Sequence, residues 1–268
     1  MKTGHLELKT GRTLIAGILN LTPDSFSDGG AWEREGVLKC VERMIAEGAD
    51  MIDIGAESTR PGGDPVSMEE ELKRLIPALE EVRRHFDIYI SVDTYKPEVA
   101  KAALEAGADM LNDISGLGYK NGKMAEVAAK YKAPVILMYN THYPHEDKEQ
   151  DLMKHINAVL FDAAQKAMAA GVSEDDIIID PGVGFAGSTE NDLVILRNLE
   201  DICSWGWPVM LGTSRKSVIG NTLKLPVDQR EEGTLVTTVL AAQAGINIVR
   251  VHDVQKSRRA LDMLEAIG

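Results

Sequence analysis

Eight short apolar runs alternate with longer amphipathic stretches along most of the chain. The runs occupy residues 14–19, 51–54, 88–92, 110–111, 134–138, 177–179, 208–211 and 246–251. Turn-forming or polar residues bound each run, which is typical of buried strands, although a short apolar run by itself also fits a helix. Pro23, Gly29 and Gly30 argue against a helix that continues beyond the first run.

Between the runs, apolar residues recur at helical spacing. The predicted helices cover residues 36–47, 68–84, 97–106, 123–131, 149–170, 192–203, 231–244 and 254–267. In the second of these, Leu72, Leu75, Ile76, Leu79 and Val82 form one apolar stripe, which indicates a helix packed onto a core. Three helices end at a glycine just before the next strand, where glycine is the usual helix stop.

This alternation of strands and helices predicts a parallel sheet with crossover helices. Eight such units in about 250 residues match a (β/α)8 TIM barrel, which we expect to form one domain over residues 1–268. Residues 5–13 predict a short β-hairpin ahead of the barrel, with its turn at Thr10 and Gly11. The alternative is an open doubly wound sheet, but no GxGxxG motif follows the first strand.

Composition narrows the classes of function. The chain has 29 Lys and Arg against 42 Asp and Glu, a net charge of −13, so no sequence-wide basic footprint indicates nucleic-acid binding. Cys40 and Cys203 lack any metal-binding or CxxC spacing and fit a reducing compartment. No apolar run approaches the roughly 20 residues that span a bilayer, and the N-terminus lacks a signal-peptide core. We therefore expect a cytoplasmic protein that does not enter a membrane.

A polar side chain lies at or near the carboxyl-terminal end of each of the eight apolar runs. The residues at these ends include Asn20, Asp53, Asp93, Asn112, Asn140, Asp180, Lys216 and Arg250, and some have polar neighbours such as Glu57, Asp113 and His252. In a TIM barrel the functional residues lie on the loops after the strands. The pattern therefore predicts one convergent polar site, although the loop after residue 19, considered alone, equally fits a solvated loop with local hydrogen bonds.

Three of these residues are suited to a heterocycle. Asp93, Asn112 and Asp180 would project toward a common pocket, and a buried carboxylate needs a partner. The partner is either a protein cation or a ligand with adjacent N–H donors, such as the aminopyrimidinone edge of a pterin or guanine. Asparagine both donates and accepts, which suits such a ring. For Asp180 the alternative is a turn or helix-cap role before Pro181.

The cations near the last two strands suit a phosphate group. The segment 212–217 could expose N–H groups at a helix start, and Arg250 and His252 share one face of the last strand. Barrels often hold phosphate at this position, and Arg60 could close the same pocket. The alternative is that these cations only pair with surface acids. No nucleophile motif is present, so a diphosphate would leave by displacement assisted by charge stabilisation.

Asn20 and Asp24 would complete this site as ligands of Mg²⁺. This ion takes oxygen ligands, keeps several waters and often bridges to phosphates. The chain has no His and Cys set with the spacing of a zinc site.

Over nearly its full length the chain resembles the dihydropteroate synthase family. The segments that carry the resemblance are NLTPDSFSDGG (20–30), DIGAESTRPGG (53–63), SVDTYKPEVA (91–100), NDISG (112–116), PVILMYN (134–140), IDPGVGF (179–185), LGTSRKS (211–217), REEGT (230–234) and RVHDV (250–254). The resemblance implies a TIM-barrel transferase that joins (7,8-dihydropterin-6-yl)methyl diphosphate to 4-aminobenzoate. It also implies a homodimer and a reaction in which pyrophosphate departs before the aniline nitrogen attacks.

The resemblance further implies roles for individual residues. The pterin ring would be held by Asp93, Asn112, Asp180 and Lys216. The diphosphate would face Thr59, Arg250 and His252, with Arg60 nearby, and Mg²⁺ would bind Asn20, with Asp24 as a second ligand. The aminobenzoate would lie among Phe26, Pro61, Phe185 and Ser217. The residues expected to act in catalysis are Asp93, Lys216, Arg250 and His252.

Four positions depart from the family pattern. Ala56 replaces a usual Gly, Tyr139 replaces a usual His, Gly187 stands where Lys is common, and Asp192 replaces a usual Asn. We expect these residues near the rim of the site, where they would affect the second substrate and the sulfonamide response more than ring binding. Two rival functions stay open: a pterin-binding methyltransferase acting on a corrinoid protein, and a non-catalytic paralogue.

Overall fold

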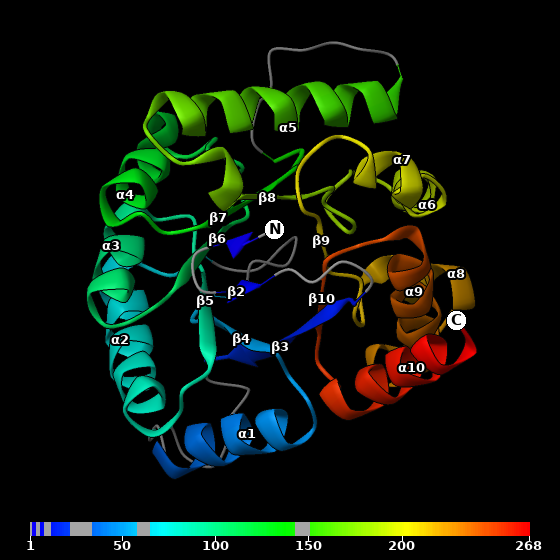
Figure 1. Ribbon diagram of the computed structural model, residues 1–268, viewed down its shortest axis with the longest axis horizontal. Coiled ribbons are helices and arrows are strands. Elements are labelled where there is room, and N and C mark those ends of the chain that lie inside the picture. Colours follow the sequence, from blue (N-terminus) through cyan, green and yellow to red (C-terminus); the bar gives the residue numbers. More distant parts are fainter. Residues whose placement is uncertain (1, 4–5, 8–11, 22–33, 58–64, 143–150) are drawn as a thin grey trace.

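Eight parallel strands form a barrel surrounded by helices in the computed structural model (Figure 1). The structure describes residues 2–3, 6–7, 12–21, 34–57, 65–142 and 151–268. Strand order follows the chain, and a parallel bridge between Ile179 and Val209 joins the two edges of the sheet. The predicted TIM barrel is therefore confirmed. Its strands are β3 (Leu14–Asn20), β4 (Met51–Gly55), β5 (Tyr89–Asp93), β6 (Met110–Asp113), β7 (Val135–Met138), β8 (Ile177–Asp180), β9 (Met210–Leu211) and β10 (Ile248–Val251).

The helices lie outside the barrel, as Figure 1 shows. They are α1 (Arg34–Ala46), α2 (Met68–His85), α3 (Pro97–Glu105), α4 (Lys123–Tyr131), α5 (Leu152–Ala169), α6 (Thr189–Arg197), α7 (Leu199–Cys203), α8 (Ser217–Leu223), α9 (Glu231–Ala244) and α10 (Val254–Ile267), with 3-10 turns η2 (Lys120–Gly122), η3 (Glu174–Asp176) and η4 (Val227–Gln229). In α2 the predicted stripe is buried at Leu75, Leu79 and Val82, and Ser67 caps the helix by accepting the Glu70 N–H.

Two helix predictions need correction. The single helix expected over residues 192–203 is two helices, α6 and α7, divided at Asn198, whose side-chain amide donates to the Val194 carbonyl. Such a local side-chain bond competes with a continuous helix. Residues 217–223, where only a helix start was expected, form the complete short helix α8.

The N-terminal hairpin also differs from its prediction. β1 (Lys2–Thr3) pairs antiparallel with β2 (Leu6–Glu7), so the hairpin lies nearer the N-terminus than residues 5–13. The turn expected at residues 10–11 lies outside the described residues. β1 lies beside η3, which directly precedes β8, so the hairpin is at the end of the barrel where the strands begin.

Alternation along the strands separates two apolar layers. Side chains such as Ile52 and Ile54 point outward and pack under the helices. Inward side chains fill the lower part of the barrel: Leu14, Ala16, Met51, Met110, Ile136, Ile178, Met210 and Ile248. This layer supports the site from below, because the next inward residue on several strands is polar. No helix among the described residues is long and apolar enough to cross a membrane.

Candidate active site

A buried polar layer lies directly above the apolar filling of the barrel. Two residues beyond Met51, Met110, Ile178 and Ile248, the inward positions hold Asp53, Asn112, Asp180 and Arg250, and β5 adds Asp93 at its end. The four acidic and amide side chains are each at most 5% exposed. The structure therefore brings the predicted ring-binding residues together at the carboxyl ends of β5, β6 and β8.

Arg250 joins two of the carboxylates. Its Nε donates to Asp53 Oδ2 at 2.5 Å, and its Nη2 donates to Asp93 Oδ2 at 2.8 Å. The pKa of Asp93 is raised to about 7: burial raises it most, the Arg250 guanidinium opposes the rise, and the Asp53 charge adds to it. Burial disfavours the charged guanidinium, but the two carboxylates hold the pKa of Arg250 above its ordinary value. The Arg250 charge therefore favours the carboxylate form of Asp93 against the effect of burial.

Asp53 also orients Asn112. The Asn112 amide donates through Nδ2 to Asp53 Oδ2 at 3.3 Å, which leaves Oδ1 as the atom available to a ligand. Asn112 Oδ1 and Asp93 Oδ1 are both buried and have no hydrogen-bond partner among the described residues. Buried acceptors of this kind are normally satisfied. Two such atoms on neighbouring strands indicate a place for a ligand with N–H donors.

Asp180 and Lys216 carry opposite charges that attract each other across the polar layer. Asp180 Oδ1 accepts the Gly182 N–H at 2.8 Å, so the turn role considered for this residue is real for one of its oxygens. Lys216 Nζ donates to the Val183 carbonyl at 2.5 Å and lies 4.9 Å from the centre of the Phe185 ring. Burial lowers the pKa of Lys216 to about 8, against the attraction of Asp180. Burial likewise raises the pKa of Asp180, and Lys216 opposes that rise.

The loop after β8 is held by close backbone contacts. Gly182 has φ of 76°, and a Cβ there would lie 1.9 Å from the Tyr139 carbonyl oxygen, so the turn requires glycine. Asp192 is 4% exposed and accepts the Gly184 N–H at 2.8 Å. Asp192 lies in α6 and therefore stabilises this loop from the helix that follows it.

Helix α9 holds the loop that carries Lys216. Arg230 donates to the Arg215 carbonyl at 2.9 Å, and the Arg215 N–H donates to Thr234 Oγ1 at 3.2 Å. The REEGT segment therefore has a scaffolding role, which sequence reasoning had not assigned. In the same loop, Ser214 Oγ lies 2.9 Å from His252 Nδ1 and accepts the His252 backbone N–H at 3.2 Å, which fixes the imidazole beside Arg250.

The mouth of the barrel has an apolar wall. Phe185, one of the residues predicted for the aminobenzoate, packs with Ile114 and Met138, and Tyr95 lies against them. Ser217 is exposed as the first residue of α8. The sequence pattern does not single out Ile114, Met138 or Tyr95 for this wall, and it assigns Asp53 no role. Strand alternation could have identified Asp53 and Met138, because each is two residues beyond an inward apolar residue.

Several predicted residues lie outside the described part of the chain: Asp24, Phe26, Thr59, Arg60 and Pro61. Asn20 is described, is half-buried at the end of β3, and pairs in register with Gly55 at the end of β4. Among the described residues, no group of three or more His, Cys, Asp or Glu side chains could hold a metal ion. The magnesium site stays a prediction.

The departures from the family pattern do not all lie at the rim. Ala56 and Tyr139 belong to the outer apolar layer under the helices, and the Tyr139 ring meets His155 edge-on at 5.7 Å. Asp192 is a buried residue of α6, so the expectation of a rim position is wrong for these three residues. Only Gly187 of the four is exposed.

Comparison with known proteins accounts for this arrangement. The family described as "Pterin binding enzyme" matches residues 16–252. A dihydropteroate synthase of Clostridium beijerinckii is 48% identical, with 100% of this chain and 99% of the relative covered. The chain belongs to the dihydropteroate synthase family.

Solved structures of this family have the same fold. A dihydropteroate synthase from Clostridium difficile, determined in the presence of pteroic acid, superposes with a TM-score of 0.91 at 45% identity over 96% of this chain and 98% of that one. The enzyme from Xanthomonas albilineans with 4-aminobenzoic acid gives a TM-score of 0.88 at 40% identity over 96% of this chain and 93% of that one. The family resemblance therefore extends from individual motifs to the whole barrel.

Proposed function

We propose that this chain is a dihydropteroate synthase that condenses (7,8-dihydropterin-6-yl)methyl diphosphate with 4-aminobenzoate, giving 7,8-dihydropteroate and pyrophosphate. The observation that carries the proposal is the pair of buried acceptors, Asp93 Oδ1 and Asn112 Oδ1, that have no partner among the described residues. The N–H groups of a pterin ring would satisfy them. Family membership and the pteroic acid and 4-aminobenzoic acid named with the solved relatives support the choice of substrates.

The ring would bind in the polar layer. Asp93, Asn112 and Asp180 would accept its N–H donors, while the ammonium of Lys216 would donate to its acceptor atoms. The apolar wall that includes Phe185 would cover the ring face and exclude water. Because Asp93 titrates near neutral pH, ring donors that prefer a carboxylate would lower its pKa on binding.

The reaction breaks the bond between the pterin methylene carbon and the diphosphate oxygen. The electron pair leaves with pyrophosphate, and the remaining cation is delocalised into the ring. Arg250 and His252 would stabilise the charge on the leaving oxygens, with the imidazole held by Ser214. The amine of 4-aminobenzoate then attacks the methylene carbon and releases a proton. Thr59 and Arg60 are proposed to face the same diphosphate.

Magnesium is the proposed metal cofactor, with Asn20 and Asp24 as its protein ligands. Oxygen ligands suit Mg²⁺, and Asn20 presents an amide at the same end of the barrel as Arg250. When bound, the ion would neutralise charge on the diphosphate and favour its departure.

The second substrate is proposed to lie near Phe26, Pro61, Phe185 and Ser217. Of these, Phe185 forms part of the apolar wall and Ser217 starts α8 near Lys216. An aromatic acid would place its ring against Phe185 and its carboxylate toward Ser217.

We also propose a homodimer. Helices α8, α9 and α10 pack together at one side of the barrel (Figure 1). Large apolar side chains are exposed on these helices and on η4: Leu223, Val227, Val236, Leu240, Met263 and Ile267. Apolar surface on adjacent elements is typical of an interface. Analytical ultracentrifugation of the wild type and of a Val236→Glu variant would test this. The cytoplasmic location stays a prediction.

The decisive experiment measures pyrophosphate release with the dihydropterin diphosphate, with and without 4-aminobenzoate. We expect Mg²⁺-dependent release coupled to formation of dihydropteroate. A methyltransferase would use the same ring pocket but has no need for Arg250 and His252 at a diphosphate. Titration with pyrophosphate and Mg²⁺ separates the two, since a methyltransferase would show no magnesium-dependent binding. A chain that binds the pterin but never turns it over would be the non-catalytic paralogue.

A further inference from the structure

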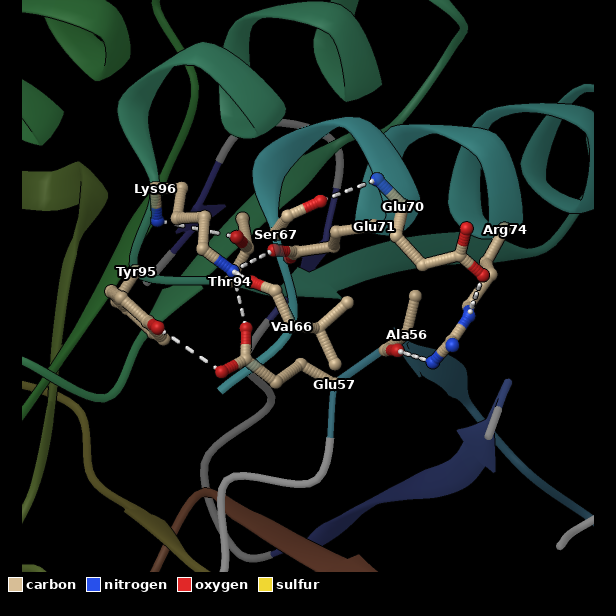
Figure 2. Close-up of polar contacts among 10 residues, drawn as sticks. All are labelled: Ala56, Glu57, Val66, Ser67, Glu70, Glu71, Arg74, Thr94, Tyr95 and Lys96. Carbon is tan, nitrogen blue, oxygen red and sulfur yellow. Dashed lines mark hydrogen bonds and ion pairs between the residues drawn. The ribbon is translucent and has the colours of Figure 1, made fainter. Parts of the chain in front are cut away.

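A buried cluster of charges lies beside the site but takes no part in the contacts described above. Lys96 follows β5 closely, and its side chain is 8% exposed. Its Nζ donates to Glu57, to Glu71 Oε2 at 2.5 Å and to the Val66 carbonyl at 2.8 Å (Figure 2). Side chains of Glu57 and Glu71 are 7% and 1% exposed. A buried ammonium with three acceptors is fully committed to this geometry.

The three acceptors come from different parts of the fold. Glu57 follows the end of β4, Val66 precedes α2, and Glu71 lies within α2. Glu57 and Val66 are therefore the two ends of the connection between β4 and α2. This connection includes Thr59 and Arg60, for which binding of the diphosphate is proposed above. A single ammonium thus ties both ends of the connection to the loop that begins just after Asp93.

Neighbouring contacts hold the same ends. The Tyr95 hydroxyl donates to the second oxygen of Glu57 at 3.0 Å, so both oxygens of this carboxylate are oriented (Figure 2). Arg74 donates to the Ala56 carbonyl at 3.4 Å. Burial works against the charged ammonium of Lys96, yet the two carboxylates raise its pKa above its ordinary value. The charge that makes the ties is therefore present at all physiological pH values.

We infer that Lys96 is a positioning residue for the reaction: its ammonium sets where the connection between β4 and α2 begins and ends relative to Asp93. The inference rests on the proposed function, because it concerns the diphosphate half of that substrate. Lys96 donates no hydrogen bond to the ring acceptors Asp93 Oδ1 and Asn112 Oδ1. Loss of the Lys96 ammonium should therefore weaken binding of the diphosphate and leave binding of the ring nearly unchanged.

The test variant is Lys96→Met, which keeps the length of the side chain and removes the charge. We expect the Kd of Mg²⁺-pyrophosphate and the KM of the dihydropterin diphosphate to rise at least tenfold. At about pH 8.5, well above the pKa of Asp93, the nearby Glu71 charge no longer decides whether Asp93 is ionised. Under that condition the Kd of 6-hydroxymethyl-7,8-dihydropterin, which has the ring without the diphosphate, should change less than threefold. A general loss of stability would not produce this division between the two probes.

Two further variants cover the case in which Lys96→Met leaves two buried carboxylates and does not fold. Glu57→Gln keeps the shape of the side chain that accepts from Lys96 but removes its charge. The triple variant Lys96→Met, Glu57→Gln, Glu71→Gln removes all three charges together, which buried ionic sets tolerate better than loss of one partner. Both variants should bind Mg²⁺-pyrophosphate more weakly and bind the dihydropterin ring with nearly unchanged affinity. Failure of all three variants to fold would assign the cluster to stability alone and overturn the inference.

Matched controls separate positioning from stability and from charge. Val82→Ala opens a cavity at the fully buried face of α2 and should lower Tm without changing either Kd. Lys120→Met removes an exposed ion pair with Glu98 and should leave both Kd values unchanged. Three results would each refute the inference. The first is an unchanged affinity for pyrophosphate in a folded Lys96 variant, and the second is an equal loss of affinity for pyrophosphate and for the ring. The third is the same loss of pyrophosphate affinity in Val82→Ala. A wild type that releases no pyrophosphate would instead refute the proposed function.

Discussion

Asp53 provides the sharpest test of the site, because it touches two proposed substrate residues and is not itself assigned to the substrate. Its carboxylate accepts from Arg250 Nε and from Asn112 Nδ2. The variant Asp53→Asn keeps the shape and an acceptor oxygen but removes the charge. The bond to Arg250 then changes from one between charged groups, worth about 1.5 to 3 kcal/mol, to one with a neutral acceptor, worth about 1 kcal/mol.

The expected loss is therefore about 0.5 to 2 kcal/mol in the placement of Arg250. If this guanidinium acts mainly on the departing diphosphate, the loss appears in kcat, as a decrease of roughly tenfold. A second effect concerns pH. Asp53 is one of the charges that raise the pKa of Asp93, so its neutralisation lowers that pKa. Because the proposed contact with the ring uses Asp93 as a carboxylate, we expect ring affinity to fall on the acidic side near pH 7 in the wild type. In Asp53→Asn this fall should move to lower pH.

Both effects are measurable in one set of experiments. Pyrophosphate release gives kcat, and titration calorimetry with 6-hydroxymethyl-7,8-dihydropterin between pH 5.5 and 8.5, on the order of 1.5 pH units either side of neutral, gives the affinity profile. Asp50→Asn is the matched control, since Asp50 lies just before the same strand, pairs with Arg12 and is remote from the polar layer. An Asp53 variant with wild-type kcat and an unmoved acidic limb would refute the role assigned to the Asp53–Arg250 pair.

The remaining predictions concern the ring pocket and its supporting loop. Lys216→Ala and Asp180→Ala should each abolish measurable pyrophosphate release and weaken ring binding by calorimetry, because each leaves buried polar groups unpaired; near-wild-type activity in either would contradict the site. Gly182→Ala should lower Tm by several degrees and reduce turnover, because the added Cβ would collide with the Tyr139 carbonyl; a neutral result would show that the turn can move. Tyr139→His should keep kcat and both KM values within about threefold, since the ring packs away from the barrel interior; a larger loss would show that the outer layer reaches the site.

The barrel itself could be predicted because its strands leave a strong signal. Each apolar run is short, buried and separated from the next by an amphipathic helix, and all eight strands fall within or beside the predicted runs. The hairpin was misplaced because strands of two residues, such as β1 and β2, are too short to show any alternation. The division between α6 and α7 depends on one asparagine side chain, which a hydrophobic pattern does not register.

The site was predicted where strand alternation applies and was incomplete beyond it. Asn112 and Asp113 both end β6, yet Asn112 points inward, while Asp113 accepts from the Ser115 and Leu117 N–H groups and supports the loop. Alternation distinguishes the two once one inward residue is known. Glu57 lies beyond the end of β4, where no period constrains it, so only the structure shows that Lys96 engages it. A local pattern of apolar and polar residues does not show which side chains from distant segments of the chain contact each other.

The charges of the polar layer explain why this arrangement suits departure of a diphosphate. Asp53, Asp93 and Asp180 face Arg250 and Lys216, so the layer holds three carboxylates and two cations around the proposed ring position. As the diphosphate leaves, the ring gains positive charge, and an excess of carboxylates beneath it stabilises that change. Arg250 belongs to both halves, because it neutralises acids under the ring and lies two residues before His252, which directly follows β10. The carboxylates of the layer thus stabilise the positive charge on the ring, while Arg250 and His252 stabilise the negative charge on the departing diphosphate.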